Sequence, residues 1–119
     1  MASFKLTIRH GPKVAREDHP TLEAAIAALR ASTERIRSEG GLPEVSVLRT
    51  YEPGDRVNAR LEISTGGILR GRDAGLDVMG DGGLVPFRGG VVRRPLEPGP
   101  EETPYDAIEA ALRGGGAEG

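Results

Sequence analysis

Apolar and polar residues alternate over residues 4–9, so that side chains of one kind point to the same side of the chain. A period of two is typical of a strand that buries one face. Residues 10–12 favour a turn, and residues 13–17 are expected to return as a second strand with Val14 directed inward. The chain is therefore predicted to begin with a β-hairpin.

The period changes to that of a helix within residues 22–38, where apolar side chains recur at helical spacing and charged residues fill the other positions. Thr21 suits the N-cap position, and the Gly40-Gly41 pair with Pro43 favours a stop after the last turn. We expect a long amphipathic helix that packs across one face of a sheet. Its apolar stripe consists of Leu22, Ala25, Ile26, Leu29 and Ile36.

Further strands are predicted after this helix. Residues 44–51 and 56–64 flank a Pro-Gly pair that suits a type II turn, and residues 76–79 form the next strand. Residues 84–94 form either two strands or one bent strand, because a Gly-Gly pair interrupts them. Residues 65–75 show no readable pattern.

A linker rich in Pro, Gly and Glu at residues 95–103 leads to a short C-terminal helix with Thr103 as N-cap and Pro104 at its first position. Residues 114–119 are expected to form a flexible tail. The predicted order is β-β-α-β-β-β-β-α, an α+β fold whose mainly antiparallel sheet carries the long helix on one face. Residues 1–113 are expected to form a single domain, in keeping with a chain of 119 residues.

The composition restricts the chemistry that the chain can support. There is no cysteine and there are only two histidines, His10 and His19, so the sequence predicts no disulfide, no metal and no cofactor. No apolar run reaches the length of a membrane span, and we expect a cytoplasmic protein that does not bind membranes. Arginine makes up 14 of the 16 basic residues, which indicates either a GC-rich bacterial genome or a thermophilic source.

Sequence motifs for catalysis are lacking. Gly66 and Gly71 have the spacing of a phosphate loop, but Asp73 stands where that loop requires a hydroxyl. None of the serines lies in a nucleophile elbow. Asp77 is best explained as a cross-strand partner for an arginine such as Arg60. The sequence therefore predicts a non-enzymatic protein.

The function that these features favour is that of a small protein-interaction or regulatory module. We expect it to form a homodimer or to dock on another cytoplasmic protein, with Pro86 near the edge of the sheet and residues 84–94 as the pairing segment, because a sheet edge is a template for a further strand. The alternative for Phe87 is a place in the core, against Ile108 and Leu112. The candidate interaction residues are Arg60, Asp77, Phe87, Arg88, Val91, Arg93 and Arg94.

Nucleic-acid binding is the alternative function. The segment that holds Arg88, Arg93 and Arg94 contains no acidic residue, and Arg70 and Arg72 add positive charge nearby. Glu101, Glu102 and Asp106 at the start of the predicted C-terminal helix have the wrong sign for phosphate binding, and only Tyr51 and Phe87 could stack on bases, which opposes this alternative. The sequence leaves the strand order and the identity of a partner open.

Overall fold

A computed structural model describes residues 4–40, 57–65, 73–89 and 94–113 of the chain. Within them the element order is β-β-α-β-β-β-β-α, which confirms the predicted α+β class. The elements are β1 (Phe4–His10), β2 (Lys13–His19), α1 (Leu22–Ser38), β3 (Val57–Thr65), β4 (Asp73–Met79), β5 (Leu84–Arg88), β6 (Arg94–Pro95) and α2 (Pro104–Leu112).

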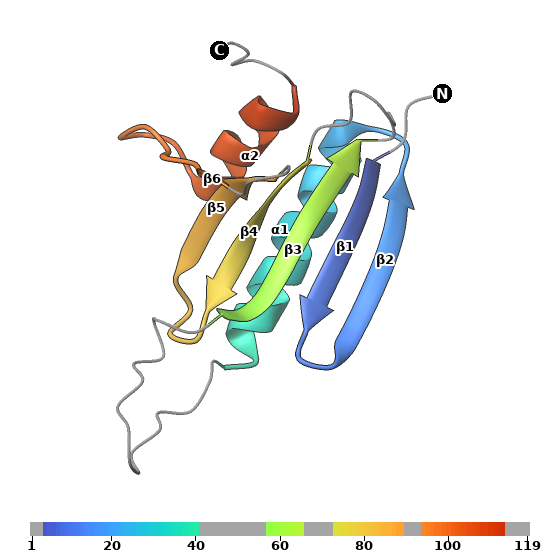
Figure 1. Cartoon of the computed structure of the whole chain (residues 1–119), viewed down its shortest axis with the longest axis vertical. Helices are drawn as coiled ribbons and strands as arrows, with labels where there is room; N and C mark the ends of the chain where they lie inside the picture. The colour runs from blue at the N-terminus through green and yellow to red at the C-terminus, as the bar shows by residue number, and fades with distance from the viewer. Residues whose placement is uncertain (1–3, 41–56, 66–72, 90–93, 114–119) are drawn as a thin grey trace.

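The six strands in the described residues form one antiparallel sheet in the order β2-β1-β3-β4-β5-β6 (Figure 1). A tight turn joins β1 to β2, and Gly11 in this turn has a φ of 63°, which glycine adopts without a steric penalty. β2 lies at the end of the sheet, and β3 lies on the far side of β1. The segment that contains α1 therefore carries the chain from the edge of the sheet back across β1.

The strand bounds differ from the predicted ones in the second half of the chain. β4 begins at Asp73 rather than at residue 76. The sequence did not predict this earlier start, because Ala74 and Gly75 are buried but too small to give a hydrophobic signal. Gly75 is required there, since a Cβ atom would collide with the carbonyl oxygen of Leu61 on β3. The strand predicted at residues 44–51 lies outside the described residues.

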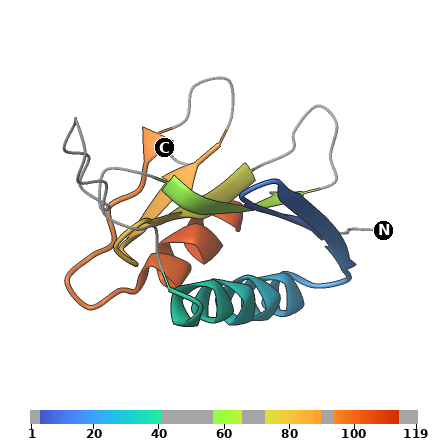
Figure 2. The same cartoon turned by 90° about the horizontal axis from the view of Figure 1, so that it is seen from below.

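Both helices cover the same face of the sheet (Figure 2). α1 packs mainly against β1 and β3, and α2 packs against β4 and β5. Alternate strand residues meet these helices and form one aliphatic core. Its largest fully buried apolar side chains are Leu6, Leu29, Ile36, Leu61, Ile63, Leu76, Val78 and Ile108.

The start of α1 and most of its apolar stripe are as predicted. The Thr21 hydroxyl accepts a hydrogen bond from the Ala24 N–H at 3.1 Å, which satisfies a free donor of the first turn. Ile26, however, is only partly buried. Because successive residues turn by about 100° around a helix axis, Ile26 lies to one side of the buried Ala25 and Leu29. The prediction that Ile26 shares their full burial is wrong.

α2 confirms the predicted C-terminal helix. The Thr103 hydroxyl accepts a hydrogen bond from the Asp106 N–H, and the Asp106 carboxylate accepts one from the Thr103 N–H. This capping box and Pro104 at the start define the N-terminus of α2. Ile108 and Leu112 then join the core beneath β4 and β5.

Candidate interaction surfaces

Arg60 and Asp77 face one another across β3 and β4 on the side of the sheet opposite the helices. The Arg60 Nε atom donates to Asp77 Oδ1 at 2.6 Å, and Nη2 donates to Oδ2 at 3.1 Å. This two-point ion pair confirms the predicted cross-strand partner. The guanidinium carbon of Arg60 also lies 5.7 Å from the centre of the Phe87 ring. We call Arg60, Asp77 and Phe87 the Arg60 cluster.

The Arg60 cluster is largely closed to solvent. Phe87 is 2% exposed and Asp77 is 9% exposed. The hydrogen bonds to Asp77 raise the pKa of Arg60, which remains charged. Both carboxylate oxygens of Asp77 already accept from Arg60, so the pair is satisfied within the chain. Its geometry suits the joining of β3 to β4 better than the binding of a partner.

Phe87 does not occupy the alternative place predicted for it beneath the C-terminal helix. It lies opposite Gly75 in the register of β4 and β5, and Gly75 alternates with Ala74 and Leu76, which face the core. Phe87 is therefore on the face away from Ile108 and Leu112. The adjacent Pro86 is buried and takes the position that faces the helices.

The predicted arginines are divided between regions. Arg88 lies on the helix-covered side and is paired in register with the exposed Arg94 of β6. Arg88 also lines a hollow of about 240 Å³ beside α2, together with Glu97 and Glu102. Val91 and Arg93 lie outside the described residues. The five candidate residues that the structure describes thus do not form one continuous surface.

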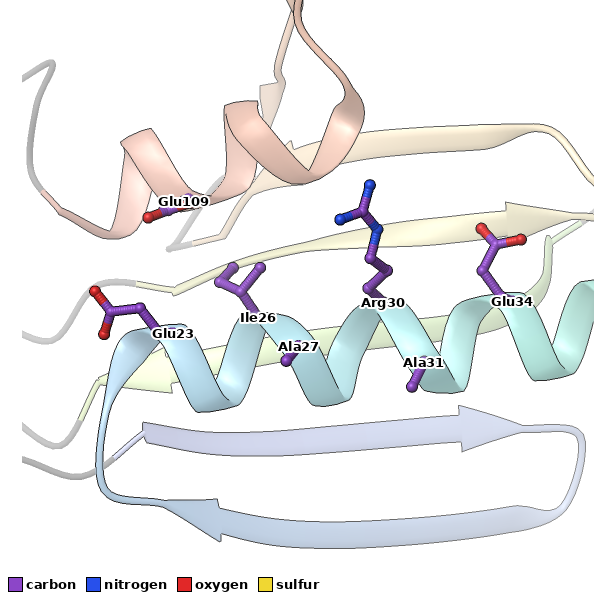
Figure 3. A pocket seen from close by; sticks show the side chains of 7 residues that line it. All are labelled: Glu23, Ile26, Ala27, Arg30, Ala31, Glu34 and Glu109. Carbon is purple, nitrogen blue, oxygen red and sulfur yellow. The ribbon is translucent and has the colours of Figure 1, made fainter.

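A groove between α1 and α2 is a second candidate surface (Figure 3). It has a volume of about 420 Å³, and the side chains of Glu23, Ile26, Arg30 and Glu34 project from α1 along it. Glu109 contributes from α2. We call this space the interhelix groove. The sequence pattern did not predict it, because the packing of two helices distant in sequence creates it.

The carboxylates in the interhelix groove have partners within the chain. Arg113 donates to Glu23 at 3.0 Å and to Glu109 at 2.6 Å. The Tyr105 hydroxyl donates to Glu34 at 2.8 Å, which lowers the pKa of Glu34. Burial and this same contact raise the pKa of Tyr105 to about 12. The pKa values of Glu23 and Glu34 are lowered, so these two carboxylates are poor proton donors near neutral pH, and the groove has the chemistry of a helix–helix contact.

β2 is the most exposed strand of the sheet. Six of its seven residues are exposed, and in the described part of the chain no strand lies beyond it (Figure 1). Val14 is 44% exposed and lies opposite Arg9, on the face away from the helices. The prediction that Val14 points inward is wrong, because Ala15, opposite the buried Ile8, takes the helix-side position.

The helix side of β2 is also uncovered. Lys13, Ala15 and Glu17 lie on this side and line a hollow of about 430 Å³ that extends to the last turns of α1. The His19 ring lies 3.0 Å from the Glu17 carboxylate. β2 was missed as a candidate site, although its residues carry a signal: apart from Val14 and Ala15 it holds only charged residues and a histidine, which is typical of an edge strand.

The hairpin geometry shows which backbone groups of β2 point away from the sheet. His10 and Lys13 form a register pair, and only two residues lie between them. In such a turn the N–H of Lys13 donates to the carbonyl of His10, and hydrogen-bonded pairs then alternate along the ladder. Lys13, Ala15 and Glu17 therefore direct their backbone groups toward β1. The N–H and C=O groups of Val14, Arg16 and Asp18 point outward; the strand with these outward groups is called the β2 edge.

Among the described residues no three His, Cys, Asp or Glu side chains are grouped so that they could hold a metal ion. None of the helices described in the chain has the length and apolar character needed to cross a membrane. No protein-family model, curated protein or solved structure matches the chain.

Proposed function

We propose that the chain is a non-enzymatic protein-interaction module that binds an extended polypeptide segment at the β2 edge. The observation that supports this function is a seven-residue terminal strand that is exposed along six of its residues. An added strand gains main-chain hydrogen bonds from such an edge, and alternate side chains supply specificity. Self-association as a homodimer and a cytoplasmic location are parts of this proposal.

The alternation of backbone direction along β2 provides the test. Arg16→Pro removes an outward N–H, so it blocks an added strand while leaving the ladder to β1 intact. Ala15→Pro is the matched control, because it removes an inward N–H from that ladder. We expect Arg16→Pro to change the free energy of unfolding by less than about 0.5 kcal/mol and Ala15→Pro to lower it by about 1–3 kcal/mol.

For the binding measurement, the whole chain is immobilised on a resin and incubated with an extract of the source cells. We expect the wild type to retain at least one polypeptide that folded Arg16→Pro does not retain. This polypeptide is either another protein or an untagged copy of the chain. Identification by mass spectrometry gives the partner. Identical retention by the two folded proteins would contradict binding at the β2 edge. It would leave residues 84–94 as the candidate pairing segment.

Nucleic-acid binding is the second candidate function. The pairing of Arg88 with Arg94 in register supports it, because two neighbouring guanidinium groups suit phosphate. Glu97 and Glu102 line the same hollow as Arg88 and repel phosphate. We therefore place this function after protein binding.

A further inference from the structure

We propose that the β2 edge pairs with the β2 edge of a second copy of the chain, with the two-fold axis at Ala15. This inference rests on the proposed function and adds the occupant and the register. It follows from the charges along β2 and from the outward backbone groups, both of which restrict how two identical strands can meet.

A two-fold axis perpendicular to the sheet joins two β2 strands antiparallel and keeps the helices of both copies on one side. Side chains that meet across the junction must then lie on the same face. One residue therefore lies opposite the same residue of the other copy, and the choice of this central residue determines all the other pairs. Only central positions near the middle of β2 allow most of the strand to pair.

With Ala15 at the centre, Lys13 of each copy faces Glu17 of the other. The small Ala15 side chains meet at the axis, and Val14 faces Arg16 on the opposite side of the sheet. Two attractive charge pairs form, and no like charges stand directly opposite one another. Lys13, Ala15 and Glu17 all border the uncovered hollow on the helix side, so no other element of the described chain blocks these pairs.

The neighbouring registers are less favourable. A centre at Arg16 places two Arg16 guanidinium groups opposite each other, and a centre at Glu17 does the same with two carboxylates. The Ala15 register also uses the outward backbone groups, because Val14 of one copy and Arg16 of the other form hydrogen-bonded pairs on both sides of the axis. Backbone direction allows each of these registers, because residues with outward groups face one another in all of them, and charge selects the register centred on Ala15.

Charge reversal tests the register directly. Lys13→Glu creates two Glu–Glu contacts across the axis, and Glu17→Lys creates two Lys–Lys contacts. We expect each single variant to raise the dimer dissociation constant by about tenfold or more relative to the wild type. Strand pairing is a small interface, so the wild-type constant is expected in the range of about 10 µM to 1 mM by sedimentation equilibrium.

The decisive measurement is an equimolar mixture of the Lys13→Glu and Glu17→Lys variants. In the mixed dimer the introduced glutamate of one copy faces the introduced lysine of the other, and the unchanged Glu17 faces the unchanged Lys13. We therefore expect heterodimers in native mass spectra at concentrations where each variant alone is monomeric. The double variant Lys13→Glu/Glu17→Lys should also regain the dimer. Arg16→Glu is the control, because Arg16 faces Val14 in this register and its reversal should change dimerisation by less than about threefold.

Each other result overturns the inference. A wild type that stays monomeric throughout this range, or a dimer that neither reversal weakens, excludes the β2–β2 contact. A dimer that Arg16→Glu weakens and Lys13→Glu does not would have the register centred on Glu17, where Arg16 faces Asp18. If the chain is monomeric but Arg16→Pro still abolishes retention of another protein, the proposed function holds and the second copy is not its partner.

Discussion

At one end of the sheet β2 leaves a seven-residue edge, whereas at the other end β5 is flanked by β6, a strand of only two residues. We call the β5 end the closed end, because β6 pairs with part of β5 and α2 packs against it. Phe87 and Arg88 pair with Pro95 and Arg94, and α2 packs beneath β4 and β5. β5, expected from the sequence to lie at the sheet edge, is therefore not the last strand, and its outer side is partly covered.

Pro86 shows how this closure is achieved. The N–H of Leu96 donates to the Pro86 carbonyl at 3.0 Å, so the Pro86 carbonyl points toward β6. The N and C=O of one strand residue point to the same side, so the missing N–H of Pro86 also faces β6. The ladder to β4 loses nothing, while the outer side lacks a donor for any added strand. No β2 residue is a proline, and its outward donors at Val14, Arg16 and Asp18 are intact.

Within the described residues, the chain therefore covers one end of its sheet and leaves the other end, at β2, without a further strand. Most natural edges are protected by charge, proline, a bulge or a covering element. β2 carries charges of both signs, which discourage indiscriminate aggregation but permit one complementary register. Predictions about the two ends can therefore fail independently.

The largest expected effect concerns the helix beneath the closed end. Ile108 is fully buried in α2, so Ile108→Ala should lower the free energy of unfolding by about 2–5 kcal/mol. Val14→Ala is the control at the open end, where a 44% exposed side chain should contribute less than about 0.5 kcal/mol. Urea denaturation followed by circular dichroism gives both values. Similar losses at the two sites would mean that Val14 is covered in solution and that the ends do not differ.

The fold was predictable where a strong period coincides with clear end signals. α1 has helical spacing, a Thr cap and a glycine stop, and its predicted bounds are confirmed. The Arg60–Asp77 pair was predictable because both residues occupy polar positions of strands with apolar neighbours. In these places local sequence and tertiary packing favour the same structure.

The two errors about which strand residue faces the helices, at Val14 and at Phe87, have a common physical cause. Val14 and Ala15 are adjacent apolar residues, as are Pro86 and Phe87, so the sequence permits either member of each pair to face the helices. The register with the neighbouring strand decides the matter, and register depends on partners distant in sequence. The interhelix groove was unpredictable for the same reason, since it depends on the position of α2 beside α1.

A smaller effect is expected from Tyr105, which joins α2 at the closed end to Glu34 of α1. A tyrosine loses its proton near pH 10 in an unfolded chain, but the folded pKa of Tyr105 is about 12. Between these values the unfolded chain binds fewer protons than the folded one, so stability falls as the pH rises from about 10 to 12 and is fully retained below this window.

Tyr105→Phe should remove this part of the loss of stability at alkaline pH. At pH 8, where the wild type keeps the hydrogen bond to Glu34, the substitution should lower the free energy of unfolding by about 0.5–1.5 kcal/mol. Glu34→Gln keeps an acceptor without the charge, so it should narrow the window without abolishing it. Unfolding by urea at several pH values measures the slope. An unchanged slope in Tyr105→Phe would show that the α1–α2 contact does not hold Tyr105 protonated.

The smallest expected effect is on nucleic-acid binding at the closed end. Arg88 and Arg94 are neighbours in register, but Glu97 and Glu102 share the hollow with Arg88, and a carboxylate beside a guanidinium weakens its attraction for phosphate. We expect no measurable binding of single- or double-stranded oligonucleotides at physiological salt, and no change on replacing Arg88 and Arg94 with Ala. Fluorescence anisotropy over a range of salt concentrations is the measurement. A micromolar complex whose logarithmic salt slope falls by about one unit for each arginine removed would make the closed end a phosphate-binding surface. Glu97→Gln/Glu102→Gln sharpens this test, because removing both carboxylates should reveal any affinity that they suppress.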